Sequence, residues 1–518
     1  MAGSEQGGLV QLRVARAVSS LKVLLRRGIP VAILRKLTIL PCWSVHTVLR
    51  IGQGVDPMQQ NGFAVAAAGV MARPRRLFAT AALPLAIGAA RATVGVVTAL
   101  ILTEALLVCA ASAPSHPAGG LALPTSQREW SLPDPGVQAG ASLLDTPRGL
   151  LVAYNTYGDP SGVGICQQAQ GAWSCVHPLV PAGLRLGDPQ LLADSGSLYL
   201  AGTLYRYGSG TAVAAVRPAL FSYRAGHWAL LAQPGGAGDP AGWVLGDQPS
   251  LTADGQGALL MAWSIYRPGF AAPAAAVSVD GGRTFRRLAL PATVRTRLGE
   301  AVALAPGLFL VAAQDVAAHR IVVWRLDARG LVRPAVREVA SYGAVRSPLP
   351  GLRFRITDTP TLARDARGTL AVAWDATAHG HVWAYLARSR DGGHTWSAPW
   401  RLAPAGATNT MQPVVRALPG SGFAVLAYAI TAANRAYRPF LSVAGSGRNV
   451  TRWVSAAGYV LTGRDGPSYL GDYPGFEAGP HGLGFAWTAL AVPSSQYTRI
   501  AVRAIGPLAG DLRQVGSN

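Results

Sequence analysis

Two short segments of the chain are closely similar and decide the fold: SVDGGRTF at 278–285 and SRDGGHTW at 389–396. Each fits the pattern Ser-x-Asp-x-Gly-x-Thr followed by an aromatic residue. The two adjacent glycines supply the positive φ angles that a tight hairpin turn needs. The aspartate can accept hydrogen bonds from the backbone of its own turn. Both segments are therefore predicted to form tips of β-hairpins, with Phe285 and Trp396 packing into the blade below.

This pattern resembles the Asp-box, also called the BNR repeat, of bacterial sialidases and other secreted β-propellers. The resemblance implies a β-propeller and a structural role for the residues that match the pattern. These are Ser278, Asp280, Gly282, Thr284 and Phe285 in the first segment and Ser389, Asp391, Gly393, Thr395 and Trp396 in the second.

A longer unit repeats along the chain around these segments. Each unit begins with a polar residue and continues as a strand, a turn and a second strand that ends in apolar or aromatic residues, and a further hairpin follows it. Seven units can be counted, at 137–154, 187–202, 246–263, 299–313, 357–374, 410–428 and 471–487. Four strands per unit make one propeller blade, so the sequence predicts an all-β propeller of seven blades. Six blades remain possible if the unit at 299–313 is incomplete.

The seventh unit lacks an outer strand after 498–506. The segment REWSLPD at 128–134 precedes the first unit and could supply that strand. Such a closure would leave no open sheet edge. Large aromatic residues at the ends of the second strands are expected to pack one blade against the next. They are Tyr154, Trp263, Trp374, Tyr428 and Trp487.

Composition agrees with this architecture. The chain of 518 residues is 50% hydrophobic and only 14% charged, with 61 glycines and 37 prolines, which suits many short strands and tight turns and argues against a disordered chain. The net charge is +21, but residues 1–112 hold 12 of the Lys and Arg against 3 Asp and Glu. Because no basic run or recognised module accompanies the remaining charge, we expect no nucleic-acid partner.

The N-terminal part is predicted to target the protein for export. Residues 1–70 form a basic extension, and the start codon could instead lie at Met71. Residues 71–113 combine arginines, a long apolar stretch and small residues, which is the pattern of a signal peptide or of a retained transmembrane anchor. Residues 114–125 form a Pro/Gly linker, and 126–518 form the propeller. We therefore expect a periplasmic, membrane-anchored or extracellular protein.

Cysteine usage supports an oxidising compartment. Cys166 and Cys175 flank a predicted hairpin in the first blade, where two strands can bring them within disulfide range. Two buried free thiols are the alternative.

The starts of the innermost strands of a propeller surround its central channel. The repeat places polar residues there, and these are predicted to form a ring at one mouth of the channel. The ring consists of Gln138, Asp188, Asp247, Glu300, Asp358, Gln412 and Asp472. Clustered carboxylates could serve acid–base chemistry or cap their own turns. We expect no metal site and no cofactor.

The segment GDYPGFE at 471–477 supplies Asp472, Tyr473 and Glu477. By resemblance to sialidases, whose nucleophile is a tyrosine, these residues and Arg355 are the candidate catalytic groups of an exo-glycosidase. A sialidase also needs three arginines, and the segment FRIT that contains Arg355 follows the first Asp-box instead of preceding it. Two hypotheses remain: an exported propeller that binds or hydrolyses glycans, and a non-enzymatic scaffold for protein partners. Either is expected to be a monomer.

Overall fold

The computed structural model describes residues 129–134, 136–157, 162–207, 213–234, 245–267, 270–290, 296–329, 335–345, 356, 359–420, 422–431, 436–444, 449–455, 459–460, 471–479, 482–490 and 498–505. The segments 1–70, 71–113 and 114–125, together with Arg355 and Asp358, lie outside the described residues. Within the described residues, no helix is long and apolar enough to cross a membrane.

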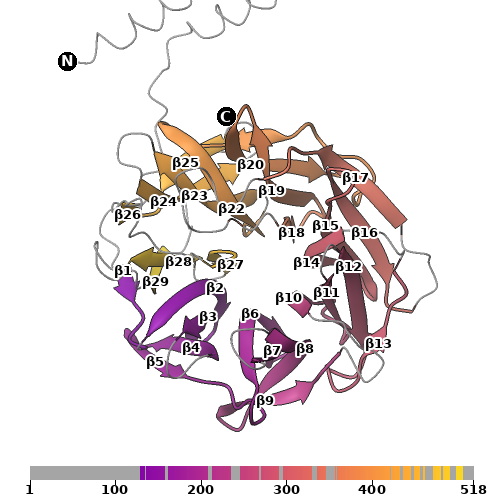
Figure 1. Ribbon diagram of the computed structural model, residues 1–518, viewed down its shortest axis with the longest axis vertical. Helices are drawn as coiled ribbons and strands as arrows, with labels where there is room; N and C mark the ends of the chain where they lie inside the picture. Colours follow the sequence, from indigo (N-terminus) through magenta and orange to yellow (C-terminus); the bar gives the residue numbers. More distant parts are fainter. Residues whose placement is uncertain are drawn as a thin grey trace, which may run out of the picture. The chain divides into compact units, whose positions relative to one another are not determined.

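The described chain forms seven antiparallel sheets around a common centre, which confirms a β-propeller of seven blades (Figure 1). Blade 1 contains β2 (Val137–Thr146), β3 (Gly149–Tyr157), β4 (Gly162–Ala169) and β5 (Ala172–Val176). Blade 2 contains β6 (Arg185–Asp194), β7 (Ser197–Tyr207), β8 (Val213–Arg224) and β9 (His227–Ala232). Blade 3 contains β10 (Leu245–Ala253), β11 (Leu259–Arg267), β12 (Phe270–Ser278) and β13 (Arg286–Arg287).

The unit at 299–313 is part of a complete fourth blade, so the six-bladed alternative is wrong. Blade 4 contains β14 (Thr296–Ala305), β15 (Leu308–Asp315), β16 (Arg320–Asp327) and β17 (Ala335–Ser341). Blade 5 contains β18 (Thr361–Arg364), β19 (Leu370–Ala378), β20 (His381–Ser389) and β21 (Trp400–Leu402). Blade 6 contains β22 (Ala407–Ala417), β23 (Phe423–Thr431), β24 (Ala436–Ala444) and β25 (Asn449–Trp453), and the short β26 (Tyr459–Val460) also pairs with β24.

Blade 7 joins the two ends of the described chain. Its strands are β27 (Gly475–Gly479), β28 (Gly482–Leu490), β29 (Thr498–Ile505) and β1 (Glu129–Ser131). β1 pairs antiparallel with β29, with Trp130 opposite Val502. The predicted closure by the segment 128–134 is therefore confirmed. No outer edge of the last blade is left without its fourth strand.

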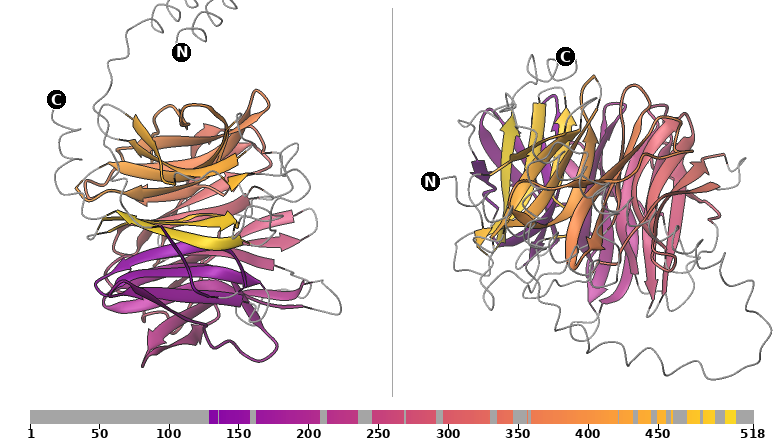
Figure 2. Two further views of the ribbon diagram at one scale, coloured as in Figure 1. Left: turned by 90° about the vertical axis from the view of Figure 1, so that its left-hand side faces the viewer. Right: turned by 90° about the horizontal axis from the view of Figure 1, so that it is seen from above.

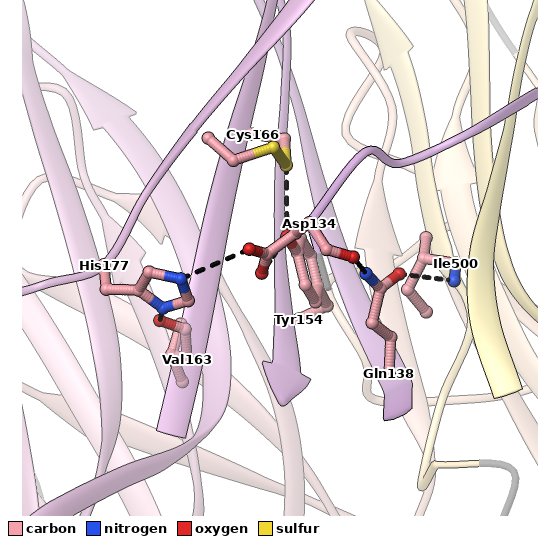
Figure 3. Close-up of a disulfide and its surroundings, with 8 residues drawn as sticks. Asp134, Gln138, Tyr154, Val163, Cys166, His177 and Ile500 are labelled. Carbon is pink, nitrogen blue, oxygen red and sulfur yellow. Dashed lines mark hydrogen bonds and ion pairs between the residues drawn. A yellow bond between two sulfur atoms is a disulfide. The ribbon is translucent and has the colours of Figure 1, made fainter. Parts of the chain in front are cut away.

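A buried polar cluster reinforces this closure (Figure 3). The amide of Gln138 donates to the carbonyl of Asp134 at 2.7 Å and accepts the backbone N–H of Ile500 at 2.9 Å. The carboxylate of Asp134 accepts the Tyr154 hydroxyl at 2.8 Å and lies 3.3 Å from His177 Nε2. Burial, together with the nearby Asp134, raises the pKa of Tyr154. The cluster ties β1 and blade 7 to the second strand of blade 1.

The predicted disulfide forms beside this cluster. Cys166 and Cys175 face each other across β4 and β5, with their sulfur atoms 1.98 Å apart. Cys166 is fully buried, and its sulfur lies 3.1 Å from the Tyr154 hydroxyl. The disulfide therefore constrains the blade that receives the closing segment.

The hydrophobic core lies between the blades, whose sheets are stacked face to face (Figure 2). The predicted packing aromatics are all buried, with side chains at most 1% exposed: Tyr154, Trp263, Trp374, Tyr428 and Trp487. Each of them lies on the second strand of its blade. Because a large aromatic side chain buries much apolar surface, these residues hold neighbouring blades together.

The two Asp-box-like turns connect the third and fourth strands of blades 3 and 5. In the first, Ser278 Oγ accepts the N–H of Gly282 at 2.8 Å and donates to Asp280 at 2.7 Å. Hydrogen bonds from Thr284 and Ser278 lower the pKa of Asp280. Ser389 and Asp391 repeat the same contacts in blade 5. The hydrogen bonds that shape these turns therefore join residues at most four positions apart.

Candidate functional site

A bulge at the start of the innermost strand shapes the centre of the propeller. In blades 2, 3 and 6 the strand register shifts at the residue before a proline, and that residue has a positive φ: Asp188 (51°), Gln248 (51°) and Gln412 (53°). A bulge redirects the side chains around it and bends the strand. The residues before proline therefore occupy the equivalent position in these blades, which shifts the predicted ring by one residue in blade 3, from Asp247 to Gln248.

In blades 1, 2 and 6, a side chain of the preceding blade accepts a backbone hydrogen bond at the bulge and holds it in place. The acceptor is the polar residue that follows the packing aromatic of the second strand. Asn155 accepts the N–H of Asp188 at 2.9 Å, and Asp375 accepts the N–H of Gln412 at 2.8 Å. Thr488 does the same for Gly140 in blade 1 at 3.3 Å. The start of each of these inner strands is thus fixed by a side chain of its neighbour.

A second series of contacts connects the inner strands directly. A side chain of one blade accepts a backbone N–H from the inner strand of the next blade. The acceptors and the amides that they bind are Ser142 with Leu191 (2.9 Å), Gln190 with Leu251 (2.5 Å), Ser250 with Ala301 (3.1 Å), Glu300 with Leu362 (3.3 Å) and Thr361 with Val415 (3.2 Å). This set, the inter-blade acceptors, gives the predicted ring member Glu300 a structural partner.

A cavity of about 80 Å³, open at its mouth, lies inside this ring, and all seven blades contribute to its wall. Gln248 forms a bridge within it. Its Nε2 donates to Asp472 Oδ2 at 2.9 Å, and its Oε1 accepts the Thr359 hydroxyl at 3.1 Å. The bridge connects blades 3, 5 and 7 across the centre of the propeller. We call it the polar bridge.

Two further side chains are fixed beside the polar bridge. The hydroxyl of Tyr473 donates to the carbonyl of Pro189 at 3.1 Å. Burial and the nearby carboxylates of Asp188, Asp472 and Asp247 raise the pKa of Tyr473 well above its usual value. The phenol is therefore neutral at ordinary pH.

Gln412 is 4% exposed and also lines the cavity. Its Nε2 donates to the carbonyl of Gly471 at 2.8 Å, which fixes the orientation of the amide. Its Oε1 is buried and has no hydrogen-bond partner among the described residues. A buried carbonyl without a donor is costly, so this atom marks a place where a bound ligand would be stabilised.

A charged cluster lies farther along the inner strands. Arg416 donates to both carboxylate oxygens of Glu300, at 2.9 and 3.0 Å, and its Nε lies 3.8 Å from Glu477. Burial acts to lower the pKa of Arg416, but the two glutamates outweigh it and raise that pKa. Burial raises the pKa of Glu477 to about 7, against the opposing effect of Arg416. Glu477 therefore titrates near neutrality.

The predicted ring is only partly assembled. Glu300, Gln412 and Asp472 line the cavity, whereas Asp188 and Asp247 act on Tyr473 from beside it. Gln138 is a correction: it is fully buried in the closure cluster, because its position lies before the bulge at Gly140. Within the described residues, no group of His, Cys, Asp and Glu could hold a metal ion.

The described candidate catalytic residues lie in two places. Asp472 and Tyr473 lie at the polar bridge, whereas Glu477 lies on β27 beside Arg416. Sequence inspection missed Gln248, Thr359 and Arg416. The first two could have been found by aligning the units on their prolines instead of on their acidic residues.

No protein-family model matches the chain, and no curated protein matches it. The chain is similar in structure to three solved proteins, among others. A protein of unknown function from Dyadobacter fermentans is 16% identical over 63% of this chain and 97% of its own, with a TM-score of 0.42. The Hadza microbial sialidase Hz136 is 16% identical over 56% and 63%, with a TM-score of 0.40. The Penicillium chrysogenum α-L-arabinanase is 14% identical over 72% and 96%, with a TM-score of 0.40.

At these identities the likeness concerns the fold alone. The fold and the site together define a seven-bladed β-propeller with a central cavity whose largely apolar wall carries a few polar groups.

Proposed function

We propose that this protein is an exported propeller that binds the end of a glycan in its central cavity without hydrolysing it. The polar bridge carries the proposal, because Asp472, Gln248 and Thr359 converge there from three blades and are already oriented by mutual hydrogen bonds. Ligand sites typically combine a few such polar groups with apolar walls. Here Pro413 and Phe476 belong to the wall, which suits the mixed hydroxyl and C–H surface of a sugar.

Binding is favoured over sialidase-type hydrolysis by the state of the candidate groups. The Tyr473 hydroxyl is committed to Pro189, and its raised pKa makes it a weak nucleophile. Arg416 is the only arginine among the described residues of the cavity wall, and Glu300 and Glu477 already hold it. No free guanidinium of the described wall would clamp the carboxylate of a sialic acid.

A panel of immobilised neutral and charged oligosaccharides tests the proposal. We expect saturable binding that falls about tenfold or more in Gln248→Leu and in Gln412→Leu, since each change removes cavity hydrogen bonds. Gln256→Leu is the matched control, because Gln256 lies on an exposed turn. Binding that none of these changes weakens, or release of a free sugar from a bound glycan, would contradict the proposal.

The export part of the proposal rests on the Cys166–Cys175 disulfide, since disulfides persist in oxidising compartments. The apolar segment 77–113 agrees with it but lies outside the described residues. Thiol alkylation of the protein from its native cells checks this. We expect both cysteines to react only after reduction; immediate alkylation would place the protein in a reducing compartment.

A scaffold for protein partners is the second candidate function. One observation favours it: the polar bridge connects three blades across the centre of the channel. Exposed apolar side chains such as Leu179 and Val279 would then contact the partner. In that case Leu179→Asp or Val279→Asp would reduce association with a purified partner, whereas Gln248→Leu would not.

A further inference from the structure

The inner strands build the wall of the central cavity in three layers. In blade 3, consecutive residues supply them: Gln248 of the polar bridge, then Pro249, then the inter-blade acceptor Ser250, and all three line the cavity. Blades 5 and 6 contribute the runs 359–361 and 412–414, again with a proline in the middle. Along the channel, the wall therefore changes from polar groups to apolar ones and then to the inter-blade acceptors.

The middle layer is apolar, and we call it the collar. Its members occupy equivalent positions in their blades and line the cavity: Ala141, Pro249, Gly299, Pro360, Pro413 and Pro474. Proline has no N–H, and neither alanine nor glycine has a polar side chain, so the side chains of the collar present only C–H surface. A group that lies within the collar should therefore be apolar.

The size of the cavity limits what can enter it. Its volume is about 80 Å³, whereas pockets that enclose a whole drug-sized ligand measure about 300–1,000 Å³. A side group of a ligand can lie between the layers, while the rest of the ligand stays at the mouth. The layers therefore select that side group rather than the whole ligand.

Polar groups with spare hydrogen-bonding capacity lie on both sides of the collar. On one side, Oε1 of Gln412 is buried without a donor among the described residues, and the bond from its Nε2 to Gly471 fixes the amide. On the other side, Ser142 and Ser250 each accept an N–H of the next blade. A hydroxyl that accepts an N–H keeps its own O–H donor. A matching ligand has a donor on the Gln412 side of the collar and acceptors on the serine side.

We infer that the side group in the cavity is the hydroxymethyl group of a terminal hexopyranose. Its hydroxyl donates to Gln412 Oε1, its CH₂ lies within the collar, and oxygens of the sugar ring accept from Ser142 and Ser250. A ring hydroxyl has no such carbon between its oxygen and the ring. Because Gln412 is buried and Arg416, further along β22, is partly exposed, the group enters from the Arg416 end. This inference rests on the proposed glycan-binding function and names the group that is recognised.

Calorimetric titration of the full-length protein with three matched sets of methyl glycosides tests the inference. Each set, of gluco, galacto or manno configuration, contains the hexoside, its 6-deoxy analogue and the corresponding pentoside without C6. In at least one set, the 6-deoxy analogue should bind about tenfold more weakly than the hexoside, because it leaves Gln412 Oε1 unpaired. The pentoside should bind about fourfold more weakly again, since it also loses an apolar carbon from the collar.

Variants connect these differences to the layers. Gln412→Leu should bring the hexoside and the 6-deoxy analogue to within about twofold of each other, and Gln412→Met serves if the first variant does not fold. Ser250→Ala should weaken both ligands by the same factor, since Ser250 acts on the ring and not on the hydroxymethyl group. The control Gln256→Leu, on an exposed turn, should leave all three affinities unchanged.

The outcomes separate the two proposals. Equal binding of hexoside and 6-deoxy analogue in every set would overturn the inference and leave glycan binding intact. So would the failure of all three sets while another glycan of the panel binds. Failure of the sets and of every glycan on the panel would overturn glycan binding and the inference with it. A preference for the hydroxyl that the folded Gln412 variants retain would also overturn the inference, since the hydroxyl would then bind elsewhere.

Discussion

The outer turns and the inner strands of this propeller use similar side chains in opposite ways. In the outer turn of blade 3, Ser278 Oγ accepts the N–H of Gly282, only four residues away. On the inner strand of the same blade, Ser250 Oγ accepts the N–H of Ala301, 51 residues away and in the next blade. One serine shapes its own loop, and the other connects two blades.

The difference explains what a sequence motif records. A local network needs particular residues at fixed spacing, so both outer turns keep the same pattern of serine, aspartate, glycine and threonine. The inter-blade acceptors need only an oxygen within reach of the next strand. Serine, glutamine, glutamate and threonine all meet that need, and no common pattern remains.

The largest effect is expected where long-range contacts close the ring. Gln138→Leu would leave the Ile500 N–H and the Asp134 carbonyl without partners in a fully buried place. We expect the free energy of unfolding to fall by about 3 kcal/mol, because each orphaned group keeps its desolvation cost. Urea unfolding measures it, with Gln256→Leu as the control. A loss below about 1 kcal/mol would show that closure does not depend on this side chain.

The next effect concerns the charged cluster on the inner strands. The pKa of Glu477 is about 7 in the folded protein, above the usual value of 4.5. Between these two pH values the folded state holds a proton that the unfolded state has lost, so stability falls as pH rises from 4.5 to about 7 and then levels off. Glu477→Gln removes this pH dependence. As pH rises from 5 to 8, the free energy of unfolding of the variant should therefore increase by about 2 kcal/mol relative to that of the parent.

Thermal or urea unfolding at several pH values checks the sign of this effect. The control Glu338→Gln changes an exposed carboxylate and should show no such trend. A gain for Glu477→Gln at pH 5 that disappears by pH 8 would reverse the expected order and refute the raised pKa.

Removing a hydrogen bond from the outer turn of blade 5 should affect that turn and not the inner strands. Ser389→Ala removes the acceptor of the Gly393 N–H and the donor to Asp391. Because Ser389 is buried, we expect a loss of about 1.5 kcal/mol. Hydrogen exchange should become faster at Gly393 and its neighbours in the turn, while the inner strands keep their protection. Faster exchange across the neighbouring blade 4 would contradict the local role of these hydrogen bonds.

A substitution on the inner strand should affect the next blade, and it should cause the smallest loss in the free energy of unfolding. Ser250→Ala removes one hydrogen bond to Ala301, and we expect about 1 kcal/mol. Here the exchange should quicken at Ala301 and its neighbours in β14 of blade 4, while blade 3 itself changes little. If exchange instead quickened only within blade 3, Ser250 would belong with the local turns.

Much of the fold could be predicted from the sequence because its signals are local or repeated. The seven units, the closing strand at 128–134 and the hairpin disulfide between Cys166 and Cys175 all follow from short patterns, and the structure confirms them. The burial of Trp263 and its equivalents follows in the same way.

The site was harder to predict, because a bulge adds one residue without a fixed signature. The predicted ring combined residues directly before a proline, such as Asp188, with residues one place earlier, such as Asp247. It also placed Gln138 in the channel. Side chains alternate along a strand, so a shift of one residue changes which of them face the centre. Gln248, Thr359 and Arg416 became visible only when the strands were placed around one axis.

The pairing of β1 with β29 also bears on the order in which the chain can fold. β1 is synthesised first, yet its partner begins at Thr498, after every other blade has been made. Contacts so distant in sequence form slowly, so the ring is expected to close only after translation of nearly the whole propeller. A ribosome that stops before Thr498 would release six blades and an unpaired strand edge, which is a ready template for aggregation.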